Sequence, residues 1–525
     1  MFDVQQPVRV EFPASIKINE PVVEIAVRSR RGFIDMLQST RQLLIIVFMA
    51  VIFTLAAQPI TDPDFWWHLK TGQYIVETRS IPHTDIFSTL RFGSEWVAHE
   101  WLSEVFIYSV FRPLGYGGLI VVFSILITAS FWIVYQRCQK RGAHPYLAGF
   151  AVLLGALSTM PTWGVRPQMF SLLFASIFIS FLDRYSRREA TISIWWLAPL
   201  MVLWVNLHAG FALGLVLVVL TIAGLLLDWF LLRKDSFAGV WRLVRPLCWL
   251  LIVCVAAVCL NPNGARMYFY PFETLSSHAM MQYIQEWRSP DFHNPLFQAL
   301  ALLLLATFSA LALSSRRPRP GQLLLLVVMA WATLRSGRNV AFFALVATPL
   351  LAEHSWTFIT NHRWGQWLIA SEKREPDERS TLKLVLNVLL FALVLIVVAL
   401  GVERAVAKQP VLEAQEFPAA ALDFLRNQKP PQPIFNEYVW GGYLIWKLYP
   451  DYRVYIDGRA DVYGDELMKE FLAVNDGNTT WREPLDNHGI RTVLVKPNVA
   501  LASLLRQDGG WHKVFEDKQA VIFVR

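Results

Sequence analysis

The stretch "LLIIVFMAVIFTLAAQPITDPDFWWHLKTG", residues 43–72, changes character halfway along its length. Its first half is almost entirely apolar, whereas its second half mixes two aspartates, a histidine and a lysine with three aromatic side chains. An apolar run of this length, folded as a helix, approaches the roughly 30 Å that crosses the hydrocarbon core of a bilayer. The sequence therefore predicts a membrane-spanning helix that ends where a polar, aromatic-rich loop begins.

The whole chain repeats this design. Of its 525 residues, 54% are hydrophobic and only 17% are charged, whereas soluble domains carry about a quarter charged residues. The apolar residues are gathered in blocks, so we predict a polytopic α-helical membrane protein with about eleven transmembrane helices. The predicted spans lie near residues 43–60, 117–136, 145–161, 168–184, 192–207, 210–232, 246–261, 295–314, 321–335, 338–352 and 383–402.

The basic residues predict the orientation of these helices. Lys and Arg gather in short tracts between apolar blocks, such as "RCQKRG" at 137–142, "DRYSRRE" at 183–189 and "SSRRPRPG" at 314–321. Such tracts mark cytoplasmic loops, so the formal net charge of +7 reflects membrane topology and does not indicate a nucleic-acid partner. We expect a multi-pass protein of the cytoplasmic (inner) membrane, with a cytoplasmic N-terminus. The four cysteines lie in or beside spans, so no extracytoplasmic disulfide is expected.

Three regions follow from this topology. Residues 1–42 form a cytoplasmic N-terminal segment, and residues 43–402 form a membrane domain with a large external loop at 61–116. Within that loop, "WVAHEWLSEVFIYSVF" at 96–111 mixes polar and apolar faces, as expected of a helix that lies in the membrane interface. Residues 403–525 contain short strand and helix patterns, which predict a small extracytoplasmic α/β domain.

The two early aspartates allow a structural and a chemical interpretation. Asp62 followed by Pro63 fits the N-cap and first position of a helix, and Asp64 would lie in its first turn, where the helix dipole favours a carboxylate. His68 lies four residues further, on the same face. A carboxylate at the membrane surface could instead take a proton from an acceptor hydroxyl or bind a divalent cation. The residues alone leave both interpretations open.

Several motifs resemble a known family. A first span, then an acidic aromatic loop and an amphipathic helix, resembles the GT-C superfamily of membrane glycosyltransferases. The match is closest to the oligosaccharyltransferase-like branch, because "DFWWHLK" at 64–70 follows the spacing of its loop motif. "SIPHTDIFS" at 80–88 and "WGGYLIW" at 440–446 are similar to two further segments of that branch.

The resemblance implies a GT-C-like fold, a polyprenyl-linked sugar donor and a catalytic carboxylate in the first external loop. Asp64 occupies the matching position, and Asp62 is its competitor. The chain departs from the branch in two respects, because it has no second-loop Asp-x-Asp and no Trp-Trp-Asp sequon-binding motif. Transfer of a glycan to asparagine is therefore not implied.

Polar residues at the predicted outer ends of spans are further candidates for the site. Charged groups at membrane depth are costly, so they tend to face a cavity or a ligand, and guanidinium groups match phosphate oxygens in a bidentate way. Interhelical packing and snorkelling are the alternatives. The candidate substrate-binding residues are His68, Arg166, His208, Arg335 and Arg338.

Two acidic groups lie in another predicted external loop. Glu286 and Asp291 in "QEWRSPDFH" could complete a divalent-cation site, for Mg²⁺ or Mn²⁺, together with Asp64. Further along, "YIDGRADVYGDE" at 455–466 predicts either a turn with its own ion pair or a contact for the acceptor.

These features favour a glycosyltransferase. We expect it to move a sugar or glycan, with inversion, from a polyprenyl-phosphate or polyprenyl-diphosphate donor to a glycan, lipid or protein acceptor on the outer face of the membrane. A non-catalytic membrane assembly protein and a lipid-linked glycan transporter are the alternatives. The charged residues lie at span ends, whereas a transporter typically carries broken helices in paired repeats.

Overall fold

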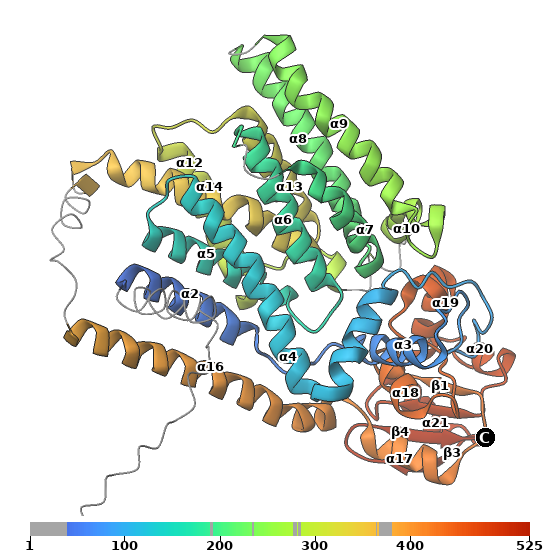
Figure 1. The fold of residues 1–525 in the computed structure, drawn as a ribbon. Coiled ribbons are helices and arrows are strands. Elements are labelled where there is room, and N and C mark those ends of the chain that lie inside the picture. The colour runs from blue at the N-terminus through green and yellow to red at the C-terminus, as the bar shows by residue number, and fades with distance from the viewer. Residues whose placement is uncertain are drawn as a thin grey trace, which may run out of the picture.

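The computed structural model describes residues 39–189, 193–233, 236–276, 281, 285–363, 365–366 and 381–525. The predicted cytoplasmic segment 1–42 lies outside these residues except for its last part, 39–42. The described chain is mostly helical and carries a small sheet near its C-terminal end, as Figure 1 shows.

Among the described residues, eight helical segments are long and apolar enough to cross a membrane. Three shorter apolar helices accompany them, and each predicted span coincides with one of these helices. The polytopic α-helical class is therefore confirmed, while the number of helices that cross the bilayer stays a prediction. The helices are α2 (Thr40–Ala56), α4 (Trp101–Lys140), α5 (Pro145–Thr159), α6 (Gln168–Ser186), α7 (Leu197–Leu207), α8 (Phe211–Leu232), α9 (Phe237–Val258), α12 (Gln298–Leu313), α13 (Pro320–Arg335), α14 (Val340–Thr360) and α16 (Thr381–Glu416).

Helix α4 joins a predicted interfacial helix to a predicted span. It bends sharply at Gly115, whose φ of 57° and ψ of −153° are readily adopted only by glycine. Figure 1 shows the two limbs of α4 meeting at an angle. The bend lets the amphipathic limb run along the external loop while the second limb enters the membrane bundle.

The C-terminal residues form a small α/β unit, as predicted. Its four strands have the order β1-β2-β4-β3, with β1 parallel to β2 and the other neighbours antiparallel. The segment "RVYIDGR" does not join this sheet, because Val454 instead bridges Ser88 in the external loop. The elements are α17 (Ala419–Gln428), β1 (Ile434–Asn436), α18 (Gly441–Leu448), α19 (Ala460–Asn475), α20 (Arg482–Asn487), β2 (Thr492–Val495), α21 (Ala500–Gln507), β3 (His512–Glu516) and β4 (Val521–Val524).

Helix α3 (Phe65–Thr78), which carries the motif that opened the sequence, packs between α4 and α18. The buried Trp66 ring meets the Tyr443 ring edge-on, with centroids 5.0 Å apart. A Cβ atom at Gly442 would lie only 2.7 Å from the carbonyl oxygen of Pro63, so glycine is required for this close approach of α18. The start of α3 is therefore held directly against the C-terminal unit.

Candidate active site

The two early aspartates lie side by side at the start of α3. The helix begins at Phe65, and Asp62 Oδ1 accepts a hydrogen bond of 3.0 Å from the backbone N–H of Asp64. Asp62 therefore closes a turn just before α3, whereas Asp64, predicted in the first turn, occupies the N-cap position without a side-chain capping hydrogen bond. The predicted N-cap at Asp62 is thus wrong by two residues, because the helix begins at Phe65 and not at Pro63. Asp64 Oδ1 accepts a 3.2 Å hydrogen bond from Trp67 Nε1, and no described residue hydrogen-bonds to its second carboxylate oxygen.

The surroundings of the pair change their acidity. Burial raises the pKa of Asp64 well above its usual range, and the neighbouring charge of Asp62 raises it further, against the opposing effects of Arg166 and the Trp67 hydrogen bond. Burial also raises the pKa of Asp62, but Arg166 opposes this most strongly. A carboxylate with a raised pKa is a stronger base, so Asp64 is suited to accept a proton.

A chain of ion pairs leads from the aspartates to the ends of membrane helices. Arg166 Nε lies 2.5 Å from Asp62 Oδ2, and its Nη1 donates to Glu286. Arg338 Nε lies 3.6 Å from the other oxygen of Glu286, and its guanidinium packs over the Trp287 ring at 4.7 Å. The structure therefore brings Arg166, Arg338 and Glu286 into one network with Asp62, although they are far apart in sequence.

Three histidines surround Glu100, which precedes the first residue of α4. The Nε2 atoms of His99, His208 and His68 lie 2.9, 3.5 and 3.7 Å from its carboxylate oxygens. His68 Nδ1 also lies 3.4 Å from Glu104. Two predicted substrate-binding residues, His68 and His208, therefore meet at a carboxylate that no sequence motif indicates.

The histidines differ in charge. Burial lowers the pKa of His68 to about 3 and that of His208 to about 4, despite the nearby Glu100. Burial would also lower the pKa of His99, but Glu100 raises it overall. Burial alone would raise the pKa of Glu100, but the charge and hydrogen bond of His99 lower it. Near neutral pH, Glu100 is thus ionised beside His99, while His68 and His208 are neutral.

A buried arginine fastens the C-terminal unit to the external loop. Arg459 donates to Asp85 over 2.7 Å and to both oxygens of Asp457 over 2.7 and 2.9 Å. Its guanidinium lies 4.6 Å from the centre of the Trp96 ring. The turn predicted in "YIDGRADVYGDE" does contain its own ion pair, and Asp85 joins it from more than 370 residues away in sequence.

This turn also touches Asp64. A Cβ atom built at Gly458 would collide with Asp64 Oδ1, at a separation that no side chain can tolerate. Gly458 thus places backbone of the C-terminal unit directly over the carboxylate.

We predict that Gly458→Ala inactivates the site, because the new methyl group must displace either Asp64 or the turn. Any reaction that uses the Asp64 carboxylate should slow at least tenfold, with Arg459 still anchoring the turn to Asp85. The matched control is Gly509→Ala, where the added methyl group meets open space. Equal activity of the two variants would show that the approach of Gly458 does not constrain Asp64.

Solved structures of other proteins share the fold of this chain. No protein-family model matches the chain, and no curated protein matches it. Among solved structures, 22 chains match. One is the oligosaccharyltransferase AglB from Archaeoglobus fulgidus in complex with an inhibitory peptide and a dolichol-phosphate, at 9% identity, a TM-score of 0.51, and coverage of 86% of this chain and 69% of that chain. The apo form of the A. fulgidus oligosaccharyltransferase matches at 12% identity and a TM-score of 0.51, with coverage of 87% of this chain and 70% of that chain.

The chain has the GT-C fold. Both neighbours are oligosaccharyltransferases, the branch that the motifs around Asp64 resemble, so the resemblance is confirmed at the level of the fold. The GT-C fold places the external loop and the C-terminal unit on one end of the helical bundle, where the aspartates lie (Figure 1).

Within this GT-C fold, three further predicted residues lie apart from Asp64 or are paired with other groups, and their roles stay predictions. Arg335 is exposed and packs over the Trp331 ring at 5.8 Å, because it ends α13 one turn away from the network of Arg338. Asp291 has a side chain that is 67% exposed and pairs with His293 at 3.2 Å. Glu286 forms ion pairs with Arg166 and Arg338.

These positions do not support the predicted cation site. Glu286 and Asp291 point to different partners, and no group of three or more His, Cys, Asp or Glu among the described residues could hold a metal ion. The residues around Asp64 therefore do not fit a preformed Mg²⁺ or Mn²⁺ site, and we derive no step through a metal.

Proposed function

We propose that this protein is a membrane glycosyltransferase that transfers a sugar or glycan from a polyprenyl-phosphate or polyprenyl-diphosphate donor to an acceptor hydroxyl on the outer face of the cytoplasmic membrane. The observation that carries the proposal is the Asp64 carboxylate, which is partly buried, has a raised pKa and lies beside the arginine network within a GT-C fold. The fold neighbour AglB holds a dolichol-phosphate, which supports a donor of this class.

The proposed reaction uses these groups in a single displacement. Asp64 takes the proton of the acceptor hydroxyl as the hydroxyl oxygen attacks the anomeric carbon. The bond from that carbon to the phosphate oxygen breaks on the opposite side, which inverts the configuration. Arg338 stabilises the departing phosphate, while Arg166 balances the charges of Asp62 and Glu286.

A groove beside the histidine cluster supports access for a lipid donor. It has a volume of about 570 Å³ and is lined mainly by apolar side chains of α4, α7 and the end of α9. Trp101 and Asn206 lie in its wall, joined by a 2.8 Å hydrogen bond. Trp101 follows Glu100 directly, and Asn206 precedes His208 by two residues. An isoprenoid chain in this groove would bring its head group next to the cluster.

We predict that Arg338→Gln raises the KM for the lipid donor about tenfold, the loss expected for one charge-assisted hydrogen bond to phosphate. Arg338 is suited to this role because its side chain is 31% exposed and its contact with Glu286 is long. The measurement is the initial rate of transfer against donor concentration. Arg335→Gln is the matched control, since Arg335 lies three residues away and outside the network. Equal KM values for the two variants would remove Arg338 from the donor site.

The decisive experiment for the function is transfer of labelled sugar by the purified full-length protein in lipid nanodiscs, with a panel of polyprenyl-phosphate and polyprenyl-diphosphate sugars. Transfer that depends on Asp64 supports the proposal. Movement of the intact donor across the bilayer without transfer would instead indicate a transporter, and neither activity with a folded protein would indicate an assembly role.

A further inference from the structure

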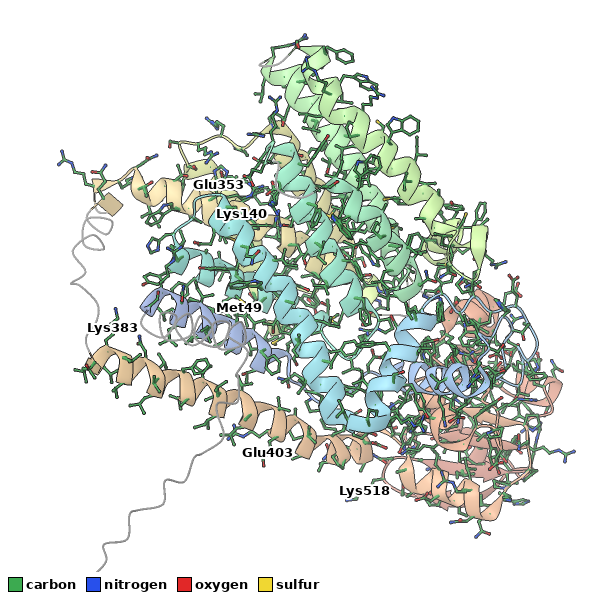
Figure 2. The ribbon with its side chains drawn as sticks, viewed as in Figure 1. Met49, Lys140, Glu353, Lys383, Glu403 and Lys518 are labelled. Atoms are coloured by element: carbon green, nitrogen blue, oxygen red, sulfur yellow. The ribbon has the colours of Figure 1, made fainter. Side chains whose placement is uncertain are left out.

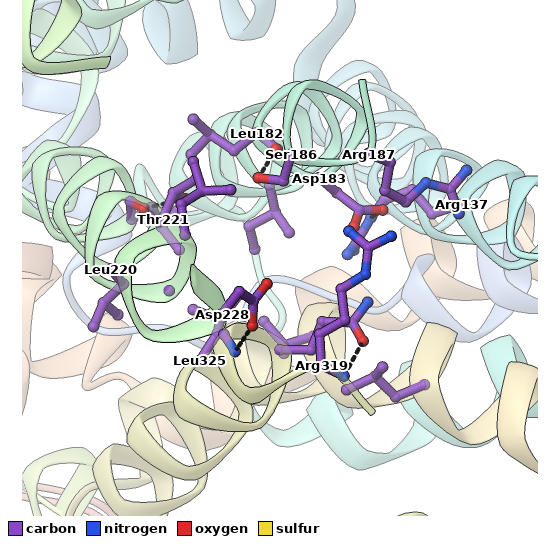
Figure 3. Close-up of a pocket in the computed structure, with 18 of the residues that line it drawn as sticks. Arg137, Leu182, Asp183, Ser186, Arg187, Leu220, Thr221, Asp228, Arg319 and Leu325 are labelled. Carbon is purple, nitrogen blue, oxygen red and sulfur yellow. Dashed lines mark hydrogen bonds and ion pairs between the residues drawn. The ribbon is translucent and has the colours of Figure 1, made fainter. Parts of the chain in front are cut away.

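A second polar region lies at the opposite end of the helical bundle from Asp64. Two neighbouring cavities there share Arg141, Arg187, Asp228 and Arg319 among their lining residues, and we call the two together the basic cavity. Figure 2 shows Lys140 and Glu353 at this end, far from Lys518 in the C-terminal unit. Figure 3 shows one of these two cavities, with Arg137, Asp183 and Arg187 on one side and Asp228 and Arg319 on the other.

The polar part of the basic cavity is strongly cationic. Seven arginines and three carboxylates line it, which gives a formal excess of four positive charges. The arginines are Arg137, Arg141, Arg187, Arg188, Arg316, Arg317 and Arg319.

The three carboxylates already have partners within the protein. Asp183 and Glu353 lie 2.6 and 2.8 Å from Arg141, and Glu353 also pairs with Arg316 at 2.9 Å. Asp228 accepts a 2.7 Å hydrogen bond from the backbone of Gly321. Outside the lining, Glu189 forms an ion pair with Arg187 and reduces the local excess from four to three. The remaining excess positive charge can attract an anion from outside the chain.

Three buried arginine Nε–H groups among the lining residues also lack a hydrogen-bond partner within the described residues. The Nε atoms of Arg137, Arg141 and Arg187 are buried, and none has a hydrogen-bond partner in the described part of the chain. The side chains of Arg137 and Arg141 are almost wholly enclosed, since these residues are only 3% and 8% exposed. An unsatisfied buried donor is unfavourable, and only Arg137 Nε has a described carboxylate nearby, Asp183 Oδ2 at 3.9 Å. The negative charges of the protein therefore leave these guanidinium groups incompletely paired.

One of the two cavities also has a substantial apolar lining, which we call the apolar part. Beside its polar groups, it is lined by Ile179 and Leu182 of α6, Leu220 of α8, Leu325 of α13 and Leu350 of α14. A cavity with several guanidinium groups at one end and aliphatic side chains at the other matches an amphiphile with an anionic head and a hydrocarbon tail. Guanidinium groups bind phosphate oxygens in a bidentate way, and basic pockets between membrane helices bind lipid phosphates.

We propose that the basic cavity binds the phosphate headgroup of an anionic membrane lipid, with the start of its hydrocarbon chain in the apolar part. A soluble phosphate would use the same arginines but would leave the apolar part unfilled, so the apolar lining favours the lipid. The proposal is independent of the chemistry at Asp64, because the two regions lie at opposite ends of the bundle.

The test uses the full-length protein in an uncharged detergent and three probes: short-chain phosphatidylglycerol, phosphatidylcholine with the same chains, and inorganic phosphate. Binding is measured by calorimetry and by the shift in thermal unfolding temperature. We expect phosphatidylglycerol to bind at least tenfold more tightly than either other probe. Equal binding of the two lipids would overturn the proposal. Binding of phosphate as tight as that of phosphatidylglycerol would assign the site to a soluble anion and overturn the proposal that a lipid occupies it.

Two variants locate the binding. The double variant Arg317→Gln, Arg319→Gln alters exposed side chains that folding does not require, and it should weaken phosphatidylglycerol binding by about fivefold for each arginine removed. Thr221→Trp, which fills the apolar part, should weaken the lipid more than phosphate. Arg242→Gln is the matched control, because Arg242 is exposed in α9 and lines neither cavity. A double variant that binds like the control would overturn the assignment.

Discussion

Asp64→Asn should reduce sugar transfer by about 10²–10⁴-fold, the contribution of a positioned general base. Asparagine keeps the shape of the side chain and an oxygen for the Trp67 hydrogen bond, but it cannot take a proton from the acceptor. The rate is measured with purified protein at saturating donor. Membrane insertion, abundance and thermal unfolding temperature should match those of the wild type, which separates lost chemistry from lost structure.

The dependence of the rate on pH offers a second readout of the same prediction. A general base works only when deprotonated, so the rate should fall as the pH falls through the pKa of Asp64. Burial and the charge of Asp62 raise that pKa well above its usual value. The acid limb should therefore lie at a pH clearly above about 4, the value expected of an ordinary aspartate.

Two comparison variants sharpen the assignment. Asp423→Asn, on the exposed face of α17, is the matched control and should leave transfer unchanged. Asp62→Asn removes the partner of Arg166 and one source of the raised pKa, so it should move the acid limb to lower pH and leave measurable activity. If Asp64→Asn were active and Asp62→Asn inactive, the general base would be Asp62.

Arg459→Met should lower the free energy of unfolding by about 3–5 kcal/mol, the cost of removing one partner from a buried ion pair. Asp85 and Asp457, both fully buried, would lose their counter-ion, and Met cannot replace the three hydrogen bonds. The measurement is denaturant or thermal unfolding followed by tryptophan fluorescence, because Trp96 lies against the guanidinium.

The direction in which stability changes with pH shows whether the lost charge of Arg459 causes the destabilisation. Burial would raise the pKa of Asp85, but Arg459 and the Ser88 hydrogen bond lower it overall. In the wild type this group therefore stabilises the fold above a pH of about 4, and that stability is lost as the pH falls through its lowered pKa. In Arg459→Met, burial without the arginine raises the pKa, so the variant should be least stable at neutral pH and recover on acidification.

An exposed ion pair in the same unit provides the control. Arg506 lies 2.6 Å from Glu516 on the surface, and Arg506→Met should change stability little because exposed pairs contribute little. Equal destabilisation by the two substitutions would show that Arg459 does not hold the external loop to the C-terminal unit.

The helices are predictable from the sequence because the length and hydropathy of a span are local properties. The block at 384–402, for example, lies within the long helix α16. The α/β character of the tail is also predictable, since β2 and β4 are short runs of β-branched and aromatic residues. Motifs that cover a small part of the chain are sufficient to predict the GT-C fold.

The partners within the site are less predictable. The sequence indicates Arg166 and Glu286 for separate reasons, and their contact across 120 residues depends on how the helices pack. Proximity in sequence groups Asp291 with Glu286, but an intervening turn directs Asp291 to solvent. Glu100 escapes prediction because a polar residue at the start of an amphipathic helix looks like ordinary surface. Its adjacency to His99 is the available signal.

The close packing of α3 against α18, together with the Arg459 contacts, bears on how this protein can be dissected. A chain truncated after α16 would uncover the indole of Trp66 and leave the carboxylate of Asp85 without a cation. The C-terminal unit prepared by itself would expose the other side of each of these two contacts. We therefore expect either fragment to aggregate or lose shape, so that acceptor binding and donor binding are best assigned by point substitutions in the undivided polypeptide.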